Sequence, residues 1–446
     1  MKRLVLALAA LVTMIAMMVV SSAASAASDV TTTEVSFTSS DGVTLHGTVF
    51  APRTATGRQP GLVLLEGAGN RGRSYLRAEA EAYARHGVVT LAYDKRSVGY
   101  SLLKRDYGLL ADDALAAVRV LRTRQGVDPD RIGLWALSEG AFVAPIAAGR
   151  SDEVAFVITV GAVGVTPAAQ TAWAYGPYLE HAGVTGRLAR TLQTTVLGTA
   201  IDVGLFPEYD FDPVPAWERV RQPVLAQWGE FDRDSVPRES SRLIREALER
   251  GGNTQHSVRI VASVNHNLHT TANEGFDRLP TLPAGYADAE VAWIHDPSRT
   301  PTGVELAPEA PTPDPVGAGT RWILVTGAVM VLGGLAFGLI RAGRLPKAFR
   351  WLAVLAPVSV LWTLCYMFFL LASAGKVTGP VVAGRPVAWL FTQLLAVGTV
   401  VAALAVLAAW HRPSKLTSAG RIRTGALTAV AALTLPWTIY WGLLWI

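Results

Sequence analysis

One serine stands where a strand pattern changes to a helix pattern. In the segment Arg131-Ile-Gly-Leu-Trp-Ala-Leu-Ser138-Glu-Gly140 an apolar run leads directly to Ser138, and small residues stand two positions before and after it, Ala136 and Gly140. Small neighbours permit a sharp strand-to-helix turn, the nucleophile elbow, which exposes the serine oxygen at a helix N-terminus. The helix dipole favours developing negative charge there. We therefore expect Ser138 to be a nucleophile, with a helix N-cap as the alternative role.

An acidic residue and a histidine follow two later strand-like runs. The run that begins at Pro223 ends in Gly229-Glu-Phe-Asp232, and the run that begins at Val258 is followed by His266. An aspartate can hold a neighbouring histidine in the tautomer that accepts the proton of a serine. We expect Asp232 and His266 to complete the site with Ser138. The alternatives are Asp234 and Glu230 for the acid, and His269 and His256 for the base.

Acyl transfer through a serine also requires N–H donors for the oxyanion. The residue after the nucleophile, Glu139, is expected to supply one donor. The loop Leu65-Glu-Gly-Ala-Gly-Asn70, after the third strand, is expected to supply the other. We assign this donor to Ala68, with Gly67 and Gly69 as alternatives. The same glycines are not followed by the Gly-Lys-Ser/Thr of a phosphate-binding loop, so phosphate binding is not favoured.

Residues 29–296 are expected to form one α/β domain that positions these groups. Apolar runs that alternate with helical patterns predict a mostly parallel sheet with helices on both faces. The first two runs are joined through Asp41-Gly42, which predicts an antiparallel hairpin. Residues 163–221 interrupt the alternation and are expected to form an inserted helical cap. The strand-like runs are Glu34–Thr38, Thr44–Phe50, Gly61–Glu66, Val88–Tyr93, Arg131–Ala136, Ala155–Val160, Pro223–Trp228 and Ser257–Val261, and the clearest helical patterns are Tyr75–His86, Leu109–Arg124 and Gly140–Ala148.

Five segments together resemble the α/β-hydrolase superfamily, and are most similar to its esterase and serine-aminopeptidase-like branch. They are Gly67-Ala-Gly-Asn-Arg71, Tyr93-Asp-Lys-Arg-Ser-Val-Gly-Tyr-Ser101, Leu137-Ser-Glu-Gly140, Gly229-Glu-Phe-Asp232 and Asn265-His266. The order Ser, Asp, His along the chain is also that of the superfamily. The resemblance covers residues 34–295 and implies an eight-stranded sheet, a Ser/Asp/His triad and acyl-transfer chemistry. The chain departs from the pattern at Ser97 and Ala136, where the superfamily usually has glycine.

The two ends of the chain carry signals for a membrane. Residues 1–26 combine Lys2-Arg3, an apolar run and a small-residue site ending at Ala26, which predicts a secretory signal peptide, with an uncleaved anchor as the alternative. Residues 297–320 hold six prolines and are expected to be an extended linker. Residues 321–446 contain four uncharged apolar segments, each long enough to span a bilayer as a helix. These segments are 322–340, 351–373, 387–410 and 425–446.

Charge placement predicts the orientation of these spans. The loops 341–350 and 411–424 hold four Lys or Arg each, whereas the loop 374–386 holds two. By the positive-inside rule the first and third loops are cytoplasmic, so the hydrolase-like domain is expected outside the cytoplasm of a multi-pass membrane protein. Lys2, Arg3 and the region after residue 320 supply 13 positive charges, which leaves residues 4–320 at −8 of a total of +5. An acidic body does not favour nucleic-acid binding.

These patterns predict an extracytoplasmic, membrane-tethered serine hydrolase that acts on a carboxylic ester. A peptidase or acyltransferase with the same triad is one alternative, and a non-catalytic hydrolase-fold binding module is another. The expected partners are a small-molecule ester or acyl substrate and the lipid bilayer. We expect no cofactor and no metal, because a single cysteine, Cys365, excludes a disulfide framework or a cysteine metal cluster.

Overall fold

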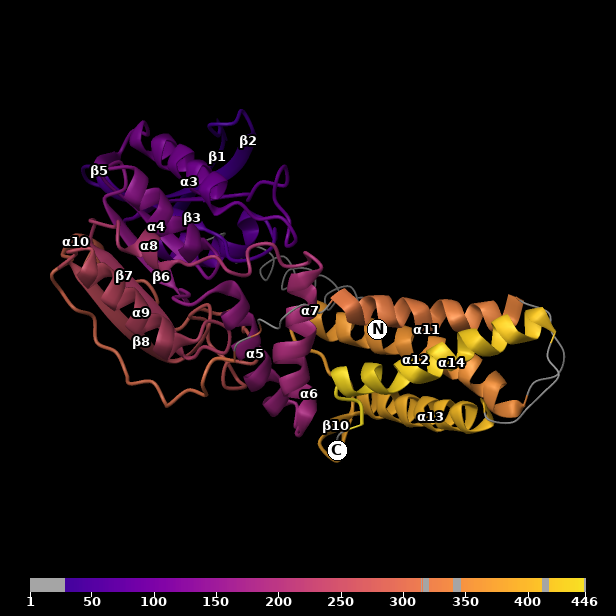
Figure 1. Ribbon diagram of the computed structural model, residues 1–446. Coiled ribbons are helices and arrows are strands. Elements are labelled where there is room, and N and C mark those ends of the chain that lie inside the picture. Colours follow the sequence, from indigo (N-terminus) through magenta and orange to yellow (C-terminus); the bar gives the residue numbers. More distant parts are fainter. Residues whose placement is uncertain (1–28, 314, 316–320, 340–345, 411–416, 445–446) are drawn as a thin grey trace, which may run out of the picture.

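The structure is a computed structural model that describes residues 29–313, 315, 321–339, 346–410 and 417–444 (Figure 1). The predicted signal peptide, residues 1–26, lies outside the described residues. An α/β domain stands at one end of the molecule, and a bundle of four long helices stands at the other. The helices α5–α7 lie between the two parts.

The α/β domain is built on one eight-stranded sheet, which confirms the predicted fold. Its strands lie in the order β1-β2-β4-β3-β5-β6-β7-β8. The pairs β1–β2 and β2–β4 are antiparallel and the other five are parallel, so the predicted hairpin is present. The strands are β1 (Val30–Thr38), β2 (Thr44–Pro52), β3 (Gln59–Leu65), β4 (Val89–Tyr93), β5 (Val127–Leu137), β6 (Phe156–Val160), β7 (Val224–Phe231) and β8 (His256–Asn265).

Helices cover both faces of the sheet because its central strands are apolar on both sides. Every residue of β4 and of β6 is buried, as is the apolar stretch of β5 that leads to Ser138. Parallel strands of this kind require a helical layer on each face. The covering helices are α2 (Arg77–Arg85), α3 (Tyr107–Arg122), α4 (Gly140–Arg150), α9 (Pro237–Arg250) and α10 (Asp288–His295), preceded by a short 3₁₀ turn η1 (Arg73–Leu76).

A helical insertion separates β6 from β7. It consists of α5 (Pro167–His181), α6 (Arg187–Arg190), a π-helical turn η2 (Thr191–Val196), α7 (Leu197–Asp202) and α8 (Val214–Trp217). Thr166 begins α5 by accepting a hydrogen bond from the Ala169 N–H, the usual role of an N-cap threonine. We refer to residues 163–221 as the cap.

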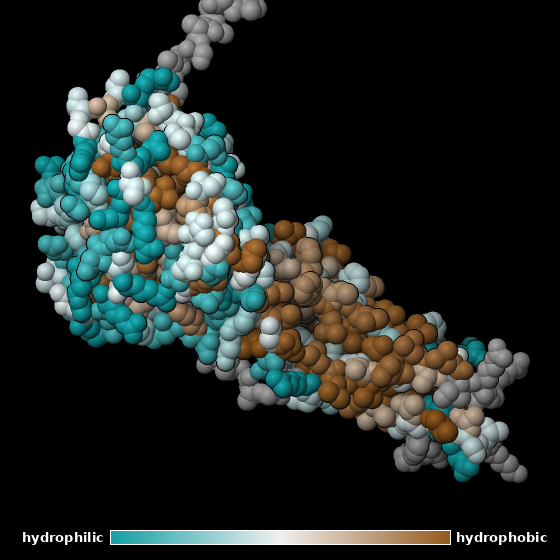
Figure 2. Space-filling model, turned by 90° about the horizontal axis from the view of Figure 1, so that it is seen from above, coloured by the Kyte–Doolittle hydropathy of each residue, from teal (hydrophilic) through white to brown (hydrophobic). Residues whose placement is uncertain are grey.

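The C-terminal helices are α11 (Arg321–Leu339), α12 (Lys347–Ala372), α13 (Val387–Trp410) and α14 (Ser418–Tyr440). All four are long and apolar enough to cross a membrane. Figure 2 shows the bundle surface as almost continuously hydrophobic, whereas the α/β domain is largely hydrophilic. This contrast is expected where lipid rather than water surrounds one part of the chain.

The fourth helix differs from the predicted span, 425–446. It begins at Ser418, because the Thr417 side chain caps it by accepting a hydrogen bond from the Gly420 N–H. Its first turns therefore contain Arg421 and Arg423, which a search for uncharged residues had excluded. The Arg423 guanidinium lies 3.6 Å from the centre of the Phe337 ring of α11. This cation–π contact gives the charge of Arg423 a partner at the end of the helix.

Candidate active site

Ser138 occupies a sharp turn between β5 and α4. Its φ of 52° lies in the left-handed region, which is rare for a residue with a side chain and is typical of strained functional positions. The helix that follows packs closely on β3, and a Cβ at Gly140 would lie 2.8 Å from the Leu65 carbonyl oxygen. Ala136 is fully buried opposite Leu65 in the sheet register, so its methyl group is accommodated where the superfamily usually has glycine.

The sheet register brings Asp232 and His266 together. Phe231 of β7 pairs with Asn265 of β8, and each is followed directly by one of the two site residues. An irregularity in the pairing between Gly229 and Phe231 makes this register possible. A Cβ at Gly229 would collide with the carbonyl oxygens of Asn265 and Val264, so only glycine lets the two strand ends approach.

Asp232 is buried and fully engaged as a hydrogen-bond acceptor. Its Oδ2 accepts from His266 Nδ1 at 2.8 Å and from the Ser235 hydroxyl at 2.5 Å. Its Oδ1 accepts from the N–H groups of Asp234 and Ser235 at 2.9 and 3.1 Å. Burial would raise the pKa of Asp232, but the charge of His266 and these hydrogen bonds lower it below its ordinary value. Asp232 is therefore held as a carboxylate.

His266 is buried against the end of β6. Burial would lower the pKa of His266, but the charge of Asp232 and the hydrogen bond to it raise that pKa above its ordinary value. The ring lies against Gly161, where a Cβ would collide with both Cε1 and Nδ1. The Ser138 N–H donates to the carbonyl of Val160 at 2.9 Å. Ser138 and His266 thus contact two consecutive residues, 160 and 161, at the same sheet edge.

In the described part of the chain, Ser138 and His266 are not joined by a hydrogen bond. Such bonds are often long in unliganded enzymes and shorten when substrate binds. Gly161 was not singled out in the sequence. Its position directly after the apolar run Ala155–Val160 was the available signal, because carboxyl ends of parallel strands share one edge of a sheet.

The structure places the alternative acids and bases in other contacts. Asp234 accepts hydrogen bonds from Tyr178 and Lys376, and Glu230 accepts one from the Ser263 N–H. His269 Nε2 lies 2.7 Å from the buried Glu79, and His256 Nδ1 lies 3.0 Å from the Asn253 carbonyl oxygen. Of the pairs considered, only Asp232 and His266 are in direct contact.

The loop after β3 lies beside the serine. The strands β3 and β5 are parallel neighbours, with Leu65 opposite Ala136. A Cβ built at Gly67 would lie 3.3 Å from Ser138 Cβ, so the loop passes directly over the nucleophile. Gly67 therefore approaches Ser138 from the end of β3, while Glu139 follows Ser138 at the end of β5. Ala68 is the next residue of the loop, and its N–H stays a prediction for the second oxyanion donor.

A buried charged network links these two donors. The Lys95 ammonium donates to Glu139 Oε1 at 2.8 Å and to the Gly67 carbonyl oxygen. The Tyr100 hydroxyl donates to the same Glu139 oxygen at 2.7 Å and accepts from the Gly69 N–H at 3.0 Å. Residues 67 and 69, on both sides of Ala68, are thereby tied to the Glu139 side chain. Lys95 and Tyr100 belong to the segment Tyr93–Ser101, but its pattern alone predicted no role for either of them.

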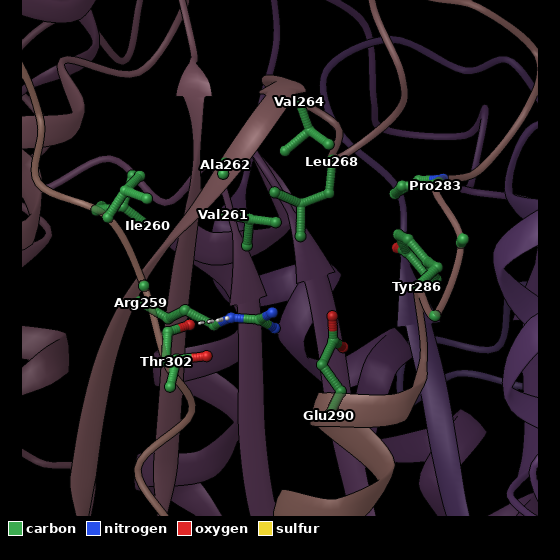
Figure 3. Close-up of a pocket in the computed structure, with 14 residues that line it drawn as sticks. Arg259, Ile260, Val261, Ala262, Val264, Leu268, Pro283, Tyr286, Glu290 and Thr302 are labelled. Atoms are coloured by element: carbon green, nitrogen blue, oxygen red, sulfur yellow. Dashed lines mark hydrogen bonds between the residues drawn. The ribbon is translucent and has the colours of Figure 1, made fainter.

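Two cavities of the α/β domain differ in their relation to these residues. One of about 760 Å³ touches Asp232 and lies between the cap and residues 306–313. The other, of about 330 Å³, lies beside β8 and touches none of Ser138, Asp232 and His266 (Figure 3). In it the side chains of Arg259 and Glu290 point toward one another, below Tyr286. In the part of the chain that the structure describes, no group of three His, Cys, Asp or Glu side chains is placed to hold a metal.

No family model matches the chain. Curated relatives match over a short region. The thiohydrolase apmlB of Arthrinium phaeospermum is 32% identical over 131 residues, 28% of this chain and 42% of that protein. The polyketide transferase claH of Penicillium crustosum is 31% identical over 135 residues, 29% of this chain and 44% of that protein. The matched region is thus less than half the length of these relatives.

Solved structures with a similar chain path include two hydrolases that match more than half of this chain. The α/β hydrolase GrgF from Penicillium sp. sh18 is 20% identical with a TM-score of 0.39, and covers 53% of this chain and 91% of its own. A dienelactone hydrolase of Anabaena variabilis is 17% identical with a TM-score of 0.39, and covers 60% of this chain and 98% of its own. The strand order of the sheet and the Ser138 elbow are those of an α/β-hydrolase fold, which is followed by a C-terminal region of four membrane-type helices. The similarity to the curated relatives covers 131 and 135 residues of the chain.

Proposed function

We propose that the protein is a membrane-tethered serine hydrolase that cleaves carboxylic esters on the extracytoplasmic side of the membrane. The observation that carries this proposal is the buried Asp232–His266 pair at the same sheet edge as the Ser138 elbow. Asp232 and His266 are in direct contact, and Ser138 and His266 contact the consecutive residues Val160 and Gly161. The relatives with names of thiohydrolases and transferases also support chemistry at an acyl carbon.

The proposed reaction proceeds through an acyl-enzyme. His266 accepts the proton of the Ser138 hydroxyl while the serine oxygen attacks the ester carbonyl, and Asp232 holds the His266 Nδ1 proton. The backbone N–H groups of Ala68 and Glu139 stabilise the oxyanion of the tetrahedral intermediate. The protonated His266 then donates its proton to the departing alkoxide. A water molecule, deprotonated by His266, releases the acid and restores Ser138.

A direct test uses the full-length chain in lipid nanodiscs with a panel of p-nitrophenyl esters and aminoacyl amides. We expect ester hydrolysis that falls by at least about 10³-fold in Ser138→Ala, because the nucleophile is lost. A fluorophosphonate probe should label the wild-type protein and not the variant. Amide hydrolysis in place of ester hydrolysis would indicate a peptidase. Full ester hydrolysis by Ser138→Ala would exclude the proposal, and an unlabelled, inactive wild-type protein would favour a binding module.

A second candidate function is acyl transfer to an acceptor other than water. It is favoured by the names of two relatives, the polyketide transferase claH and the acyltransferase drtE of Aspergillus calidoustus, the latter 31% identical over 131 residues, 28% of this chain and 42% of that protein. The acyl-enzyme at Ser138 would be common to both reactions. Adding alcohol, amine and thiol acceptors to the ester assay separates them. A transferase forms acylated acceptor at the expense of free acid, whereas a hydrolase forms free acid at an unchanged rate.

A further inference from the structure

The loop that connects α12 to α13 in the membrane region contacts the segment after β7 that carries Asp232. Residues 373–386 connect α12 to α13, and Lys376 in this loop lies 3.0 Å from Asp234 Oδ1. The same ammonium lies 4.5 Å from the centre of the Tyr178 ring in the cap. The Tyr178 hydroxyl donates to the other Asp234 oxygen at 3.0 Å. Asp234 is therefore held from two directions, by the cap and by the membrane region.

Asp234 is hydrogen-bonded in turn to Asp232, the carboxylate proposed to orient His266. The Asp234 N–H donates to Asp232 Oδ1 at 2.9 Å, and its carbonyl oxygen accepts from the Gln170 amide at 2.9 Å. Only Asp232 then separates this aspartate from His266. A continuous set of hydrogen bonds thus runs from Lys376 through Asp234 and Asp232 to His266.

The position of Lys376 is fixed by close packing of its loop on the cap. Gly375 has a φ of +71°, and a Cβ there would lie 2.9 Å from the Tyr175 ring. The Thr185 N–H donates to the Gly384 carbonyl at 2.8 Å, and Thr199 shares a hydrogen bond of 2.9 Å with Tyr440. Figure 1 shows the cap helices seated on this end of the bundle. The cap and the bundle also share one apolar core, to which Tyr175, Leu179, Leu188, Leu192, Tyr366, Leu370, Trp437 and Trp441 belong.

We propose that the membrane region is part of the catalytic unit, with Lys376 as a positioning residue for the loop that carries Asp232. The inference rests on the proposed function, because it takes His266 as the base of the reaction and Asp232 as the carboxylate that orients it. It also gives the four-helix region a role beyond anchoring, which a single span would fulfil. Both side chains of the Lys376–Asp234 pair are partly exposed, so the pair contributes little to folding stability. Its effect should appear in turnover.

The pH dependence of kcat/KM distinguishes a positioning role of Lys376 from a purely structural one, because Lys376 acts on the pKa of His266 through its charge. The charged groups that act on His266 are Asp232 and Asp234, which raise its pKa, and Lys376, which lowers it. His266 must be neutral to accept the serine proton, so activity falls as pH falls through its pKa. Removing the positive charge of Lys376 should move this acidic limb of kcat/KM to higher pH. Removing the negative charge of Asp234 should move it to lower pH.

The experiment measures kcat/KM against pH for a short p-nitrophenyl ester, with the full chain in nanodiscs. We expect Lys376→Gln to lower kcat/KM at the optimum about fivefold and to shift the acidic limb upward. Lys376→Arg should restore both properties. Asp234→Asn should shift the limb downward, and the double variant should be less impaired than the product of the two single effects predicts. Arg385→Gln is the matched control, a cation removed from the same loop but without a contact to residues 232–235 in the described structure.

The outcomes separate this inference from the proposed function. A Lys376→Gln variant with wild-type kcat/KM and a wild-type pH profile, beside an inactive Ser138→Ala, would overturn the role of Lys376 alone. A loss of activity with an unshifted profile and no rescue by arginine would also overturn it, because it would indicate a general packing defect. Full activity of Ser138→Ala would overturn both the proposed function and this inference.

Discussion

At the residue scale, the protonation of His266 depends on opposing effects of burial and charge. Burial has the largest single effect on the pKa of His266 and disfavours the imidazolium. The charge of Asp232, 2.8 Å from Nδ1, the hydrogen bond to it and the charge of Asp234 favour the imidazolium and together outweigh burial. The pKa of His266 is therefore raised. For a base that acts when neutral, a raised pKa means that activity is complete only above that pKa and is lost as pH falls through it.

Replacing Asp232 by asparagine tests this balance. The amide keeps the size of the side chain but removes the charge, so the pKa of His266 should fall and the acidic limb of kcat/KM should move to lower pH. The turnover number should fall about 10³- to 10⁴-fold, because the favourable tautomer of His266 is no longer enforced. Glu230→Gln, which changes a nearby carboxylate at the end of β7 that is bound to the Ser263 N–H, should leave the limb in place. An unshifted limb in Asp232→Asn would argue against the pair.

The sequence predicted which residues form this pair but not what surrounds it. Asp232 and His266 each follow an apolar run, and that local pattern is readable in a single segment. Gly161 is different, because its importance comes from the His266 ring packed on it from a strand more than 100 residues later. The contact of Lys376 with Asp234 joins the membrane region to the α/β domain, which lie far apart in the sequence. Such tertiary contacts leave no local pattern.

At the element scale, three strand ends are joined by the buried group of Lys95, Tyr100 and Glu139. Lys95 and Tyr100 follow β4, the loop 66–72 follows β3, and Glu139 begins α4. A buried carboxylate is costly unless it is paired and hydrogen-bonded, and Lys95 and Tyr100, the partners of Glu139, are bound at the same time to the loop 66–72. The network therefore fixes the loop relative to the nucleophile elbow.

Removal of the Tyr100 hydroxyl should loosen the loop 66–72 without removing a backbone N–H group that is expected to bind the oxyanion. We expect Tyr100→Phe to lower kcat about tenfold, less than the 10²–10³-fold typical of a lost oxyanion donor, with KM nearly unchanged. The affinity for a transition-state analogue such as a boronic acid should fall in parallel with kcat. Tyr83→Phe is the matched control, since Tyr83 is also buried and also bonds a buried glutamate, Glu290, but in another part of the domain. Equal losses in both variants would contradict a specific role for Tyr100.

The elements themselves were predicted unevenly. All eight strands overlap the predicted strand-like runs. Burial on both faces leaves few alternatives for central strands such as β4 and β6. The helix α9 was not identified, since Pro237–Arg250 is rich in Arg, Glu and Ser and buries only a narrow stripe that includes Ile244 and Leu248. Most of its buried residues are small or polar, and a search for apolar runs does not detect such a helix.

At the scale of the whole molecule, the arrangement of the bundle and the α/β domain bears on topology. The cap packs on the ends of the bundle formed by the start of α11, the end of α12, the start of α13 and the end of α14. The other ends adjoin the loops with four Lys or Arg each, 341–350 and 411–424. The described basic residues next to these loops, Lys347, Arg350, Arg421 and Arg423, thus lie at the end of the bundle opposite to the α/β domain. This separation agrees with the positive-inside expectation that the α/β domain faces outward.

Cysteine accessibility tests that orientation. With the single native cysteine removed by Cys365→Ala, a new cysteine is introduced either at Thr300, exposed after α10, or at Lys347, exposed at the start of α12. A membrane-impermeant maleimide should label Thr300→Cys in sealed right-side-out vesicles, because that position lies with the α/β domain. Lys347→Cys should be labelled only after the membrane is opened, because it lies in the basic segment 341–350, which is expected in the cytoplasm. Labelling of Lys347→Cys alone in sealed vesicles would reverse the orientation and place the Ser138 site in the cytoplasm.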